Sequence, residues 1–349
     1  MSAFLNFLLS AVSTVALLFL TLRSVIGRSV MDQPDRLNSM HTQPIPRIGG
    51  AALMMIVFIA AWVTGIASVF SAILGATLFL SVVSITDDMI GLSASLRLLA
   101  HLLAATFIAL FFITAANDSP LFDQIRRTPT TALALIAITL VLLITWSANL
   151  FNFMDGADGL AGGMSLIGFG AYAIAASQFM TTSPGAGSVA TLCAITSGAS
   201  LGFLFFNFAP AKVFMGDAGS ISLGFLAAVL GIHGISLGLW AWWFPLLVFS
   251  PFIVDATTTL IKRIAKGEKI WIAHRQHYYH QLILSGWNHR RVALSYYGVM
   301  IACGGSALLA REATFPAPLL AFWVVIYVTL IIFLERHFRL KRESRDSRQ

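Results

Sequence analysis

The stretch TALALIAITLVLLITWSANLFNFMDGADGL, residues 131–160, decides the fold class of this chain. Its first 24 residues carry no charged side chain, and such a run is long enough for a helix to cross a hydrocarbon core of about 30 Å. Asn152, Asp155 and Asp158 then follow at spacings of three residues, among glycines. The stretch predicts a membrane-spanning helix that ends at a cluster of polar side chains.

Apolar runs of this kind recur along the whole chain of 349 residues. Hydrophobic residues make up 58% of the chain and charged residues 11%, whereas soluble proteins are about half apolar and a quarter charged. No small-residue cleavage site follows the first run, residues 5–22, so we interpret it as a retained span. The pattern predicts about eleven transmembrane helices, centred near Val15, Ile56, Leu74, Ala105, Ile138, Gly168, Ser197, Ala228, Leu247, Val299 and Tyr327.

These spans form one domain. No long Pro-rich, Ser-rich or charged linker and no internal repeat divides residues 1–349. We therefore expect an all-α integral membrane protein with a single polytopic domain, followed by a basic tail at residues 336–349. Cys193 and Cys303 lie inside apolar spans, so neither a metal site nor a disulfide framework is indicated.

The distribution of Lys and Arg predicts the orientation. One set of connections and the tail hold 19 of the 22 basic residues, whereas the other side holds Arg126, Arg127 and Arg311. Because cytoplasmic segments are enriched in Lys and Arg, we expect a periplasmic N-terminus and a cytoplasmic C-terminus. The net charge of +7 then reflects topology and does not indicate a nucleic-acid partner.

Almost all polar clusters fall on the predicted cytoplasmic side. They occupy residues 32–50, 87–88, 152–163, 207–220 and 262–291. A secondary transporter or ion channel would need charged residues near the centres of several spans and pathways on both faces. A nonenzymatic scaffold gives no reason for so many acidic and amide side chains on one side. The pattern therefore favours chemistry at one membrane face.

Asp87 and Asp88 directly follow an apolar run. Two adjacent carboxylates repel each other unless water, a cation or a metal compensates. We interpret them as residues that handle a metal or phosphate, with an interfacial helix cap as the alternative.

Two further clusters contain oxygen ligands. Asn152, Asp155 and Asp158 would share one face if their segment is helical, although Asn and Asp also form turns and caps. Asp217, which lies between Gly216 and Gly219, opens another apolar run, and a helix N-terminus favours anions such as phosphate. An Asp there can hold Mg²⁺ together with substrate phosphates; for this fragment alone, a simple cap explains the residue equally well.

The largest polar connection contains HRQHYYH, residues 274–280. Arg binds phosphate through a planar fork and His supplies a donor or a titratable group, so the stretch suits a nucleotide diphosphate. Tyr278 or Tyr279 could stack on a base, although interfacial anchoring is commoner for Tyr. The lysines before it fit ordinary cytoplasmic charge.

Three ionisable residues lie within apolar runs. We expect Asp255 to face the bundle interior because a charge is costly in lipid. For His101 and His233 we expect hydrogen bonds between helices.

Taken together, five motifs resemble the polyprenyl-phosphate N-acetylhexosamine-1-phosphate transferase superfamily, of the glycosyltransferase family 4 type. They are HTQPIPRIGG at residues 41–50, Asp87-Asp88, NFMDGADG at residues 152–159, FMGDAGS at residues 214–220 and the HRQHYYH stretch. Their order and their shared side carry the resemblance, which covers nearly all spans.

The resemblance implies a Mg²⁺-dependent enzyme of the bacterial inner membrane with its active site on the cytoplasmic face, in which Mn²⁺ can substitute. The implied substrates are a UDP-N-acetylhexosamine and undecaprenyl phosphate, and a homodimer is compatible with it. The expected site residues are catalytic Asp87, Asp88, Asp155 and Asp158, metal-binding Asp217 and Asn152, and substrate-binding His274, Arg275, His277, His280, Arg47, Asp255 and Ser220.

Within the superfamily, the chain is more similar to the branch that primes O-antigen, teichoic acid and related glycans than to the muramyl-pentapeptide branch. The latter has three successive histidines in the last loop, whereas this chain has Arg275 after His274. Compared with the Asp-Arg-x-His-x-His-His pattern of the priming branch, His274 replaces the Asp and Tyr279 replaces one His. The implied donor is UDP-GlcNAc or a 6-deoxy or amino-modified relative.

Overall fold

The computed structural model describes residues 2–24, 31–32, 44–114, 120–269, 272, 274–313 and 316–346. Within these residues the only strands are the short pair β1 (Met31–Asp32) and β2 (Ile45–Pro46), which are antiparallel. The predicted all-α class is confirmed. The helices are α1 (Ala3–Arg23), α2 (Gly49–Val63), α3 (Ser71–Ile90), α4 (Ala94–Thr114), α5 (Pro120–Arg126), α6 (Thr130–Phe153), α7 (Leu160–Ser177), α8 (Ala186–Asn207), α9 (Asp217–Ser236), α10 (Trp243–Val248), α11 (Ser250–Ala265), α12 (Tyr278–Leu284), α13 (His289–Leu309) and α14 (Ala317–Asp346).

Nine helices of the described chain are long and apolar enough to cross a membrane. They are α1, α3, α4, α6, α7, α8, α9, α13 and α14. Two predicted spans differ from the rest: α2 has only 15 residues, and the span expected near Leu247 is broken into α10 and α11. The span count of eleven therefore stays a prediction.

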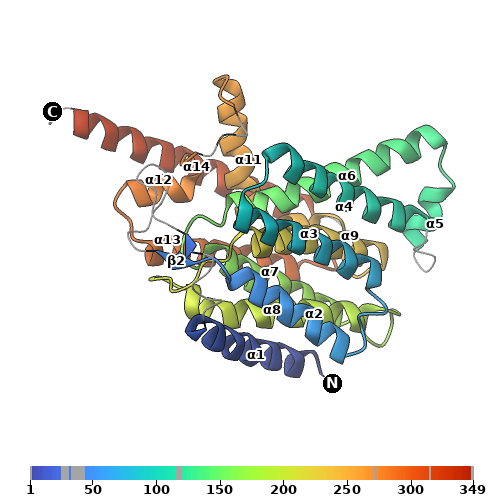
Figure 1. Cartoon of the computed structure of the whole chain (residues 1–349). Coiled ribbons are helices and arrows are strands. Elements are labelled where there is room, and N and C mark those ends of the chain that lie inside the picture. Colours follow the sequence, from blue (N-terminus) through green and yellow to red (C-terminus); the bar gives the residue numbers. More distant parts are fainter. Residues whose placement is uncertain are drawn as a thin grey trace.

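The break between α10 and α11 has a local cause. Pro251 has no N–H with which to bond the Leu247 carbonyl four residues earlier. The Ser250 hydroxyl donates to that carbonyl instead, at 2.7 Å. The broken span consequently leaves the bundle in a new direction, and α11 projects away from the other helices in Figure 1.

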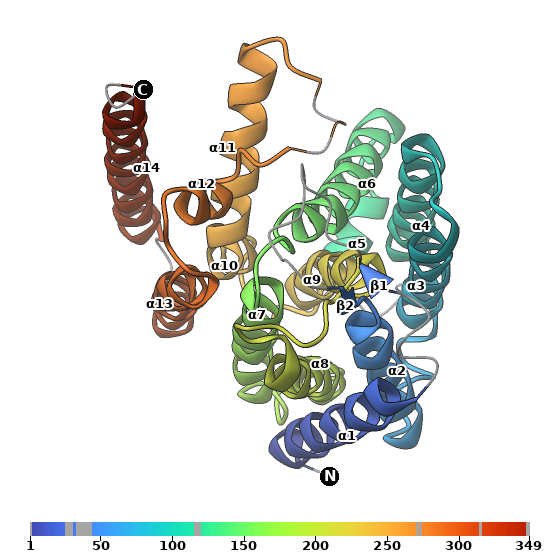
Figure 2. The ribbon, with the colours of Figure 1, turned by 60° about the vertical axis from the view of Figure 1, so that its left-hand side comes forward.

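Helix α9 lies at the centre of the bundle, surrounded by α2, α3, α6 and α7 (Figure 2). Its glycines permit this position. A Cβ on Gly224 would lie 2.4 Å from the backbone carbonyl oxygen of Ser147 in α6. A Cβ on Gly50 of α2 would lie 2.4 Å from the Gly219 Cα. Close helix crossings of this kind need small residues. Asp217, the first residue of α9, is thereby fixed by the core of the fold.

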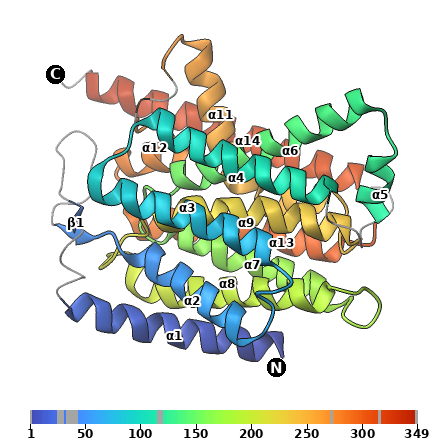
Figure 3. The ribbon, with the colours of Figure 1, turned by 45° about the vertical axis from the view of Figure 1, so that its right-hand side comes forward.

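The chain termini lie at opposite ends of the bundle (Figures 1 and 3). We call the end that holds β2, α12 and the end of α14 the polar end; the start of α1 and α5 lie at the other. This arrangement agrees with termini on opposite sides of a membrane, and the compartments remain predictions. The expected basic tail continues α14 as helix to Asp346.

The two histidines within the spans, His101 and His233, differ in their hydrogen bonds. His101 meets the Asn149 side chain of α6 at 3.2 Å, as expected for a bond between helices. For His233 the expectation stays a prediction: its buried Nδ1 has no hydrogen-bond partner among the described residues, and the ring packs against Phe70 and Phe112.

Candidate active site

Backbone pairing joins two of the motifs at the polar end. The amides of Gly49 and Gly50, at the start of α2, donate to the carbonyl oxygens of Phe214 and Met215 at 2.9 and 2.8 Å. The extended segment before α2 therefore lies along the segment before α9. Arg47 is carried on it, directly beside the N-terminus of α9.

Gly216 lets a carboxylate reach the N-terminus of α9. Its φ of +72° is a left-handed value that favours glycine. A Cβ there would lie 2.8 Å from Asp88 Oδ2. Asp88, in the last turn of α3, also accepts a hydrogen bond from the Ala218 amide. Asp88 is therefore held between the positive end of α9 and its cationic neighbours.

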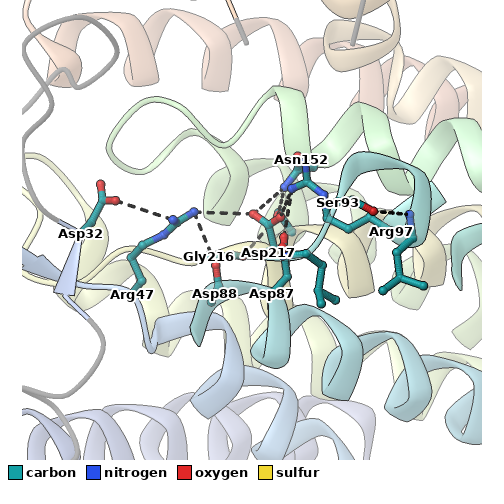
Figure 4. Close-up of polar contacts among 12 residues, drawn as sticks. Asp32, Arg47, Asp87, Asp88, Ser93, Arg97, Asn152, Gly216 and Asp217 are labelled. Atoms are coloured by element: carbon teal, nitrogen blue, oxygen red, sulfur yellow. Dashed lines mark hydrogen bonds and ion pairs between the residues drawn. The ribbon is translucent and has the colours of Figure 1, made fainter. Parts of the chain in front are cut away.

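Two arginines join the acidic residues into one cluster (Figure 4). Arg47 Nη2 lies 3.6 Å from Asp88 Oδ1 and 3.6 Å from Asp217 Oδ1, and Arg47 Nη1 lies 3.6 Å from Asp32 Oδ1. Arg97 Nη1 lies 3.0 Å from Asp87 Oδ2 and 3.3 Å from Asp217 Oδ2. Each oxygen of Asp217 thus faces one guanidinium group.

Asp87 also has a local partner. The Leu92 amide donates to Asp87 Oδ1 at 2.6 Å, which fixes the turn between α3 and α4. Asp87 therefore caps the end of α3, as in the alternative interpretation, and also pairs with Arg97 of the cluster. That the pair handles a metal or phosphate stays a prediction.

Asn152, near the end of α6, connects the cluster to a third helix. Its Nδ2 donates to Asp217 Oδ1 at 2.9 Å and to Ser220 Oγ at 3.2 Å. Ser220 is fully buried and its hydroxyl donates to the Gly216 carbonyl. The structure therefore places Ser220 behind Asn152, where it orients the amide.

The segment after Asn152 is not one continuous helix. Helix α6 ends at Phe153, a turn follows, and α7 begins at Leu160. Asn152, Asp155 and Asp158 therefore do not share a single helical face, and the turn that was the alternative is what forms.

Asp155 lies in this turn, within electrostatic reach of the cluster. Burial raises its pKa well above the usual range of a carboxyl. Arg47 opposes the shift, whereas the charges of Asp217, Asp88 and Asp158 add to it. The crowding of like charges around Asp155 is the electrostatic signature of a cation-binding or proton-handling site.

Asp158 has a different environment. Its Oδ2 accepts from the Ala211 amide at 3.0 Å, and its Oδ1 lies 3.2 Å from Nδ1 of His289. These contacts tie the α6–α7 turn to the segment before α9 and to the start of α13. The structure gives Asp158 a bracing position beside the cluster.

The stretch from His274 to His280 is anchored by Asp255 of α11. Asp255 Oδ1 accepts from the Tyr278 amide at 2.9 Å and Oδ2 from the Tyr279 amide at 3.2 Å. The Tyr296 hydroxyl donates to Oδ2, and His277 Nδ1 lies 3.4 Å from Oδ1. Asp255 faces the interior, as predicted, and its acceptor positions are occupied by the protein.

An aromatic layer joins this stretch to the α6–α7 turn. The His277 ring stacks on Tyr279 and on Phe153, and the Tyr279 hydroxyl donates to the Phe153 carbonyl at 2.9 Å. A Cβ on Gly156 would lie 2.2 Å from the Tyr279 hydroxyl and 2.9 Å from Nε2 of His280. Gly156 therefore lets α12 close over the turn that carries Asp155.

The tyrosines of this layer are interior side chains. Tyr278 and Tyr279 are 6% and 1% exposed, so protein atoms already cover the rings expected to stack on a base. Burial also lowers the pKa of His274 to about 4 and that of His280 to about 3, with the neighbouring His277 as the next cause. Both rings are consequently neutral near pH 7.

The structure brings Arg47, Asp87, Asp88, Asn152 and Asp217 into direct contact and places Asp155 beside them. His41, part of the first motif, lies outside the described residues.

Sequence reasoning missed the roles of Arg97, Asp32 and His289. A signal for Arg97 existed: a three-residue connection between α3 and α4 forces the last turn of one helix to face the first turn of the next. The charge distribution along the sequence assigns Arg97 only to the basic residues of the predicted cytoplasmic side.

The cluster is rich in carboxylate oxygens, and oxygen atoms are the ligands that Mg²⁺ prefers. Among the described residues, no three His, Cys, Asp or Glu side chains are placed to hold a metal by themselves. Mg²⁺ is commonly held by one or two carboxylates together with substrate phosphates. Asp217 and Asn152 fit such a site, because Asp217 carries both oxygens at the cluster centre and Asn152 has an amide oxygen besides its donating nitrogen.

Residues 68–235 match the protein family described as glycosyl transferase family 4. A probable undecaprenyl-phosphate N-acetylglucosaminyl 1-phosphate transferase of Bacillus subtilis (strain 168) is 30% identical over 94% of this chain and 89% of that protein. The phospho-N-acetylmuramoyl-pentapeptide-transferase of Geobacillus thermodenitrificans (strain NG80-2) is 28% identical over 84% of this chain and 92% of that protein. The decaprenyl-phosphate N-acetylglucosaminephosphotransferase of Mycobacterium tuberculosis (strain CDC 1551 / Oshkosh) is 28% identical over 86% and 81%.

Proposed function

The chain belongs to glycosyl transferase family 4, and on that premise we propose that it transfers an N-acetylhexosamine 1-phosphate from a UDP-sugar to undecaprenyl phosphate and releases UMP. One observation carries the proposal: Arg47 and Arg97 join Asp217 to Asp88 and Asp87 at one end of a bundle of membrane-length helices. The names of relatives that act on undecaprenyl and decaprenyl phosphate support the acceptor.

The position of the cluster suits a reaction between a lipid and a soluble nucleotide. A polyprenyl chain stays in the bilayer while its phosphate lies at the membrane surface. The cluster lies at the ends of α3 and α6 and at the starts of α4 and α9, so it is at the edge of the apolar bundle. We infer a multi-pass enzyme of the bacterial inner membrane whose site faces the cytoplasm, as the distribution of basic residues predicts.

Charge balance supports a divalent cation in this site. Four carboxylates, those of Asp32, Asp87, Asp88 and Asp217, form ion pairs with the two guanidinium groups of Arg47 and Arg97. A pyrophosphate brought to an excess of negative charge would be repelled. Mg²⁺ held by Asp217 and Asn152 would neutralise phosphate charge and polarise the phosphoryl oxygens.

The chain's own residues then bind and orient the two phosphate groups. An oxygen of the lipid phosphate forms a bond to the β-phosphorus of the UDP-sugar, and the bond from that phosphorus to the bridging oxygen breaks. UMP leaves with the electron pair. Arg47 and Arg97, at the cluster, would neutralise the phosphates, and we expect Arg275 to assist, so little covalent chemistry is left for the protein.

A general base is not required for this step. Phosphate monoesters have a second pKa of about 6, so the attacking lipid phosphate is mostly dianionic at neutral pH. Asp87 is held by Arg97 and the Leu92 amide, and Asp88 by Arg47 and the Ala218 amide. We therefore assign both carboxylates to orienting the arginines and the cation.

For the donor, we propose UDP-GlcNAc or a 6-deoxy or amino-modified UDP-HexNAc, which would initiate a lipid-linked cell-surface glycan such as an O-antigen. The His274-Arg275 pair in place of successive histidines supports this branch. Transfer of phospho-N-acetylmuramoyl-pentapeptide is the second candidate, because several relatives carry that name.

The test uses the full-length protein in detergent with Mg²⁺ and undecaprenyl phosphate. A panel of UDP-GlcNAc, UDP-GalNAc, 6-deoxy UDP-HexNAc and UDP-MurNAc-pentapeptide is assayed for UMP and for the lipid product. We expect lipid-dependent UMP release with one HexNAc donor. Release only with the pentapeptide donor would select the second candidate. A folded, monodisperse protein that releases no UMP with any donor would overturn the proposal.

A further inference from the structure

A largely apolar pocket lies on the far side of α12 from the acidic cluster. Its volume is about 650 Å³, within the range of pockets that hold small molecules. Helices α11, α12, α13 and α14 form its walls, with Leu282, Val299, Leu330 and Leu334 among the lining side chains. In Figure 2, α14 stands beside these helices at the edge of the molecule. We propose that this pocket binds a chain of an anionic phospholipid whose headgroup lies at Arg291 and Lys341.

The shape of the pocket fits a hydrocarbon chain. Its lining along α14 runs from Tyr327 to Lys341, a distance of about 21 Å at a rise of 1.5 Å per residue. The inner part is bounded by Tyr327, Pro251 and Val299, and the outer part by Trp287 and Lys341 at the polar end. The pocket therefore runs along the bundle, as a lipid chain does in a bilayer.

The outer end of the pocket carries positive charge. Arg291 and Lys341 both line it and are exposed. Arg291 lies 3.9 Å above the Trp287 ring, and Lys341 donates to the Ser285 carbonyl, so both cations are oriented at the rim. Basic residues at this level of a membrane protein attract anionic headgroups.

One further polar group points to a ligand. His337 lines the pocket, and its buried Nε2 has no hydrogen-bond partner among the described residues. Such an atom is costly unless something pairs with it. The one carboxylate of the described lining is Asp255, whose oxygens already accept bonds from the Tyr278 and Tyr279 amides and the Tyr296 hydroxyl. These three donors occupy the carboxylate oxygens and partly offset their charge.

The occupant differs from the reacting lipid. Asp255, in the pocket wall, accepts from the Tyr279 amide, and the Tyr279 hydroxyl donates to the Phe153 carbonyl beside the cluster. The ring of Tyr279 thus stands between pocket and cluster. A polyprenyl phosphate with its phosphate at Asp217 would have to pass through this layer to enter the pocket. A second lipid, with its phosphate at the rim, fits without such a passage.

The test measures lipid retention by the full-length protein in native mass spectrometry, with dioleoyl phosphatidylglycerol and dioleoyl phosphatidylcholine as probes. The two lipids share their chains and differ in charge. We expect phosphatidylglycerol to be retained preferentially, and Arg291→Gln with Lys341→Gln to weaken its retention by about tenfold, the loss expected for charge-assisted hydrogen bonds.

The matched control is the double variant Arg336→Gln with Arg339→Gln. It also removes two positive charges, but from positions on α14 outside the pocket lining. Val299→Trp fills the pocket and keeps both cations, so it should also reduce retention. Equal retention of the two lipids, or equal effects of the two double variants, would overturn the proposal. So would competition by undecaprenyl phosphate that removes phosphatidylglycerol stoichiometrically, because the pocket would then belong to the substrate. The binding readout is independent of transferase activity.

Discussion

Replacement of Asp255 by Asn should release the stretch that carries the His and Arg residues. Asp255 Oδ1 accepts from the Tyr278 amide, and Oδ2 accepts from the Tyr279 amide and the Tyr296 hydroxyl, while His277 lies beside Oδ1. In Asn an amide NH₂ group replaces one carboxylate oxygen. This hydrogen-bond donor then faces at least one N–H or O–H donor of the protein. Each buried group left unpaired costs about 1–3 kcal/mol, so we expect a local destabilisation of about 2–5 kcal/mol, because the carboxylate charge is lost as well.

The assay is hydrogen exchange of the peptide spanning residues 274–284 in the full-length protein. A loss of 2 kcal/mol or more corresponds to at least about thirtyfold faster exchange. Thr259→Val is the matched control, since its hydroxyl reaches Asp255 only at 3.4 Å and its loss should change exchange little. Unchanged exchange in Asp255→Asn would refute the anchoring role and return Asp255 to direct substrate binding.

Four further perturbations test the cluster and its frame. Asp217→Asn should abolish Mg²⁺-dependent UMP release in a folded protein; an unchanged Mg²⁺ titration would remove Asp217 from the metal site. Arg97→Gln should lower kcat/KM by about 30-fold, or 2 kcal/mol, because it removes the cation between Asp87 and Asp217. Arg97→Lys should be intermediate, because Lys keeps the charge without the planar guanidinium group; equal activities would contradict this. Burial lowers the pKa of His280 to about 3, whereas in the unfolded protein it is about 6.5. The unfolded state therefore binds an extra proton below pH 6.5, and the free energy of unfolding falls as the pH drops. His280→Gln should reduce the pH dependence of that free energy by up to about 1.4 kcal/mol per pH unit, and an unaltered pH dependence in acid unfolding would count against this. Gly50→Ala should destabilise the protein by about 1–3 kcal/mol in thermal unfolding, because its Cβ would meet Gly219 at 2.4 Å, whereas Gly75→Ala, with open space around it, should not.

The membrane class and the polar ends of the helices were predictable from local pattern. Apolar length decides where a helix can cross lipid, and the motif at Asn152 directly follows such a run. The start of α9 at Asp217 also follows from its glycine-flanked position. Apolar length does not predict the break between α10 and α11, because Pro251 lies inside an apolar run and its missing N–H does not change the hydropathy of that run.

The pairing inside the site could not be derived from the sequence. Nothing local indicates that Arg47 and Arg97, from different connections, divide the two oxygens of Asp217 between them. That division depends on how α2, α3 and α4 cross α9. The same limit explains Asp255: the family resemblance implied a substrate ligand, whereas its role in the structure is set by the tyrosines of α12 and α13 that surround it.

The two halves of the site differ in how firmly the fold holds them. The acidic half rests on the ends of closely packed helices, with Gly50 against Gly219 at the crossing of α2 and α9. The half that carries Arg275 is attached through Asp255 on the projecting α11 and through the bond from Tyr279 to the Phe153 carbonyl. A change in the distance between Arg275 and Asp217 must therefore involve α11 and α12, since a shift of α9 would disturb the core.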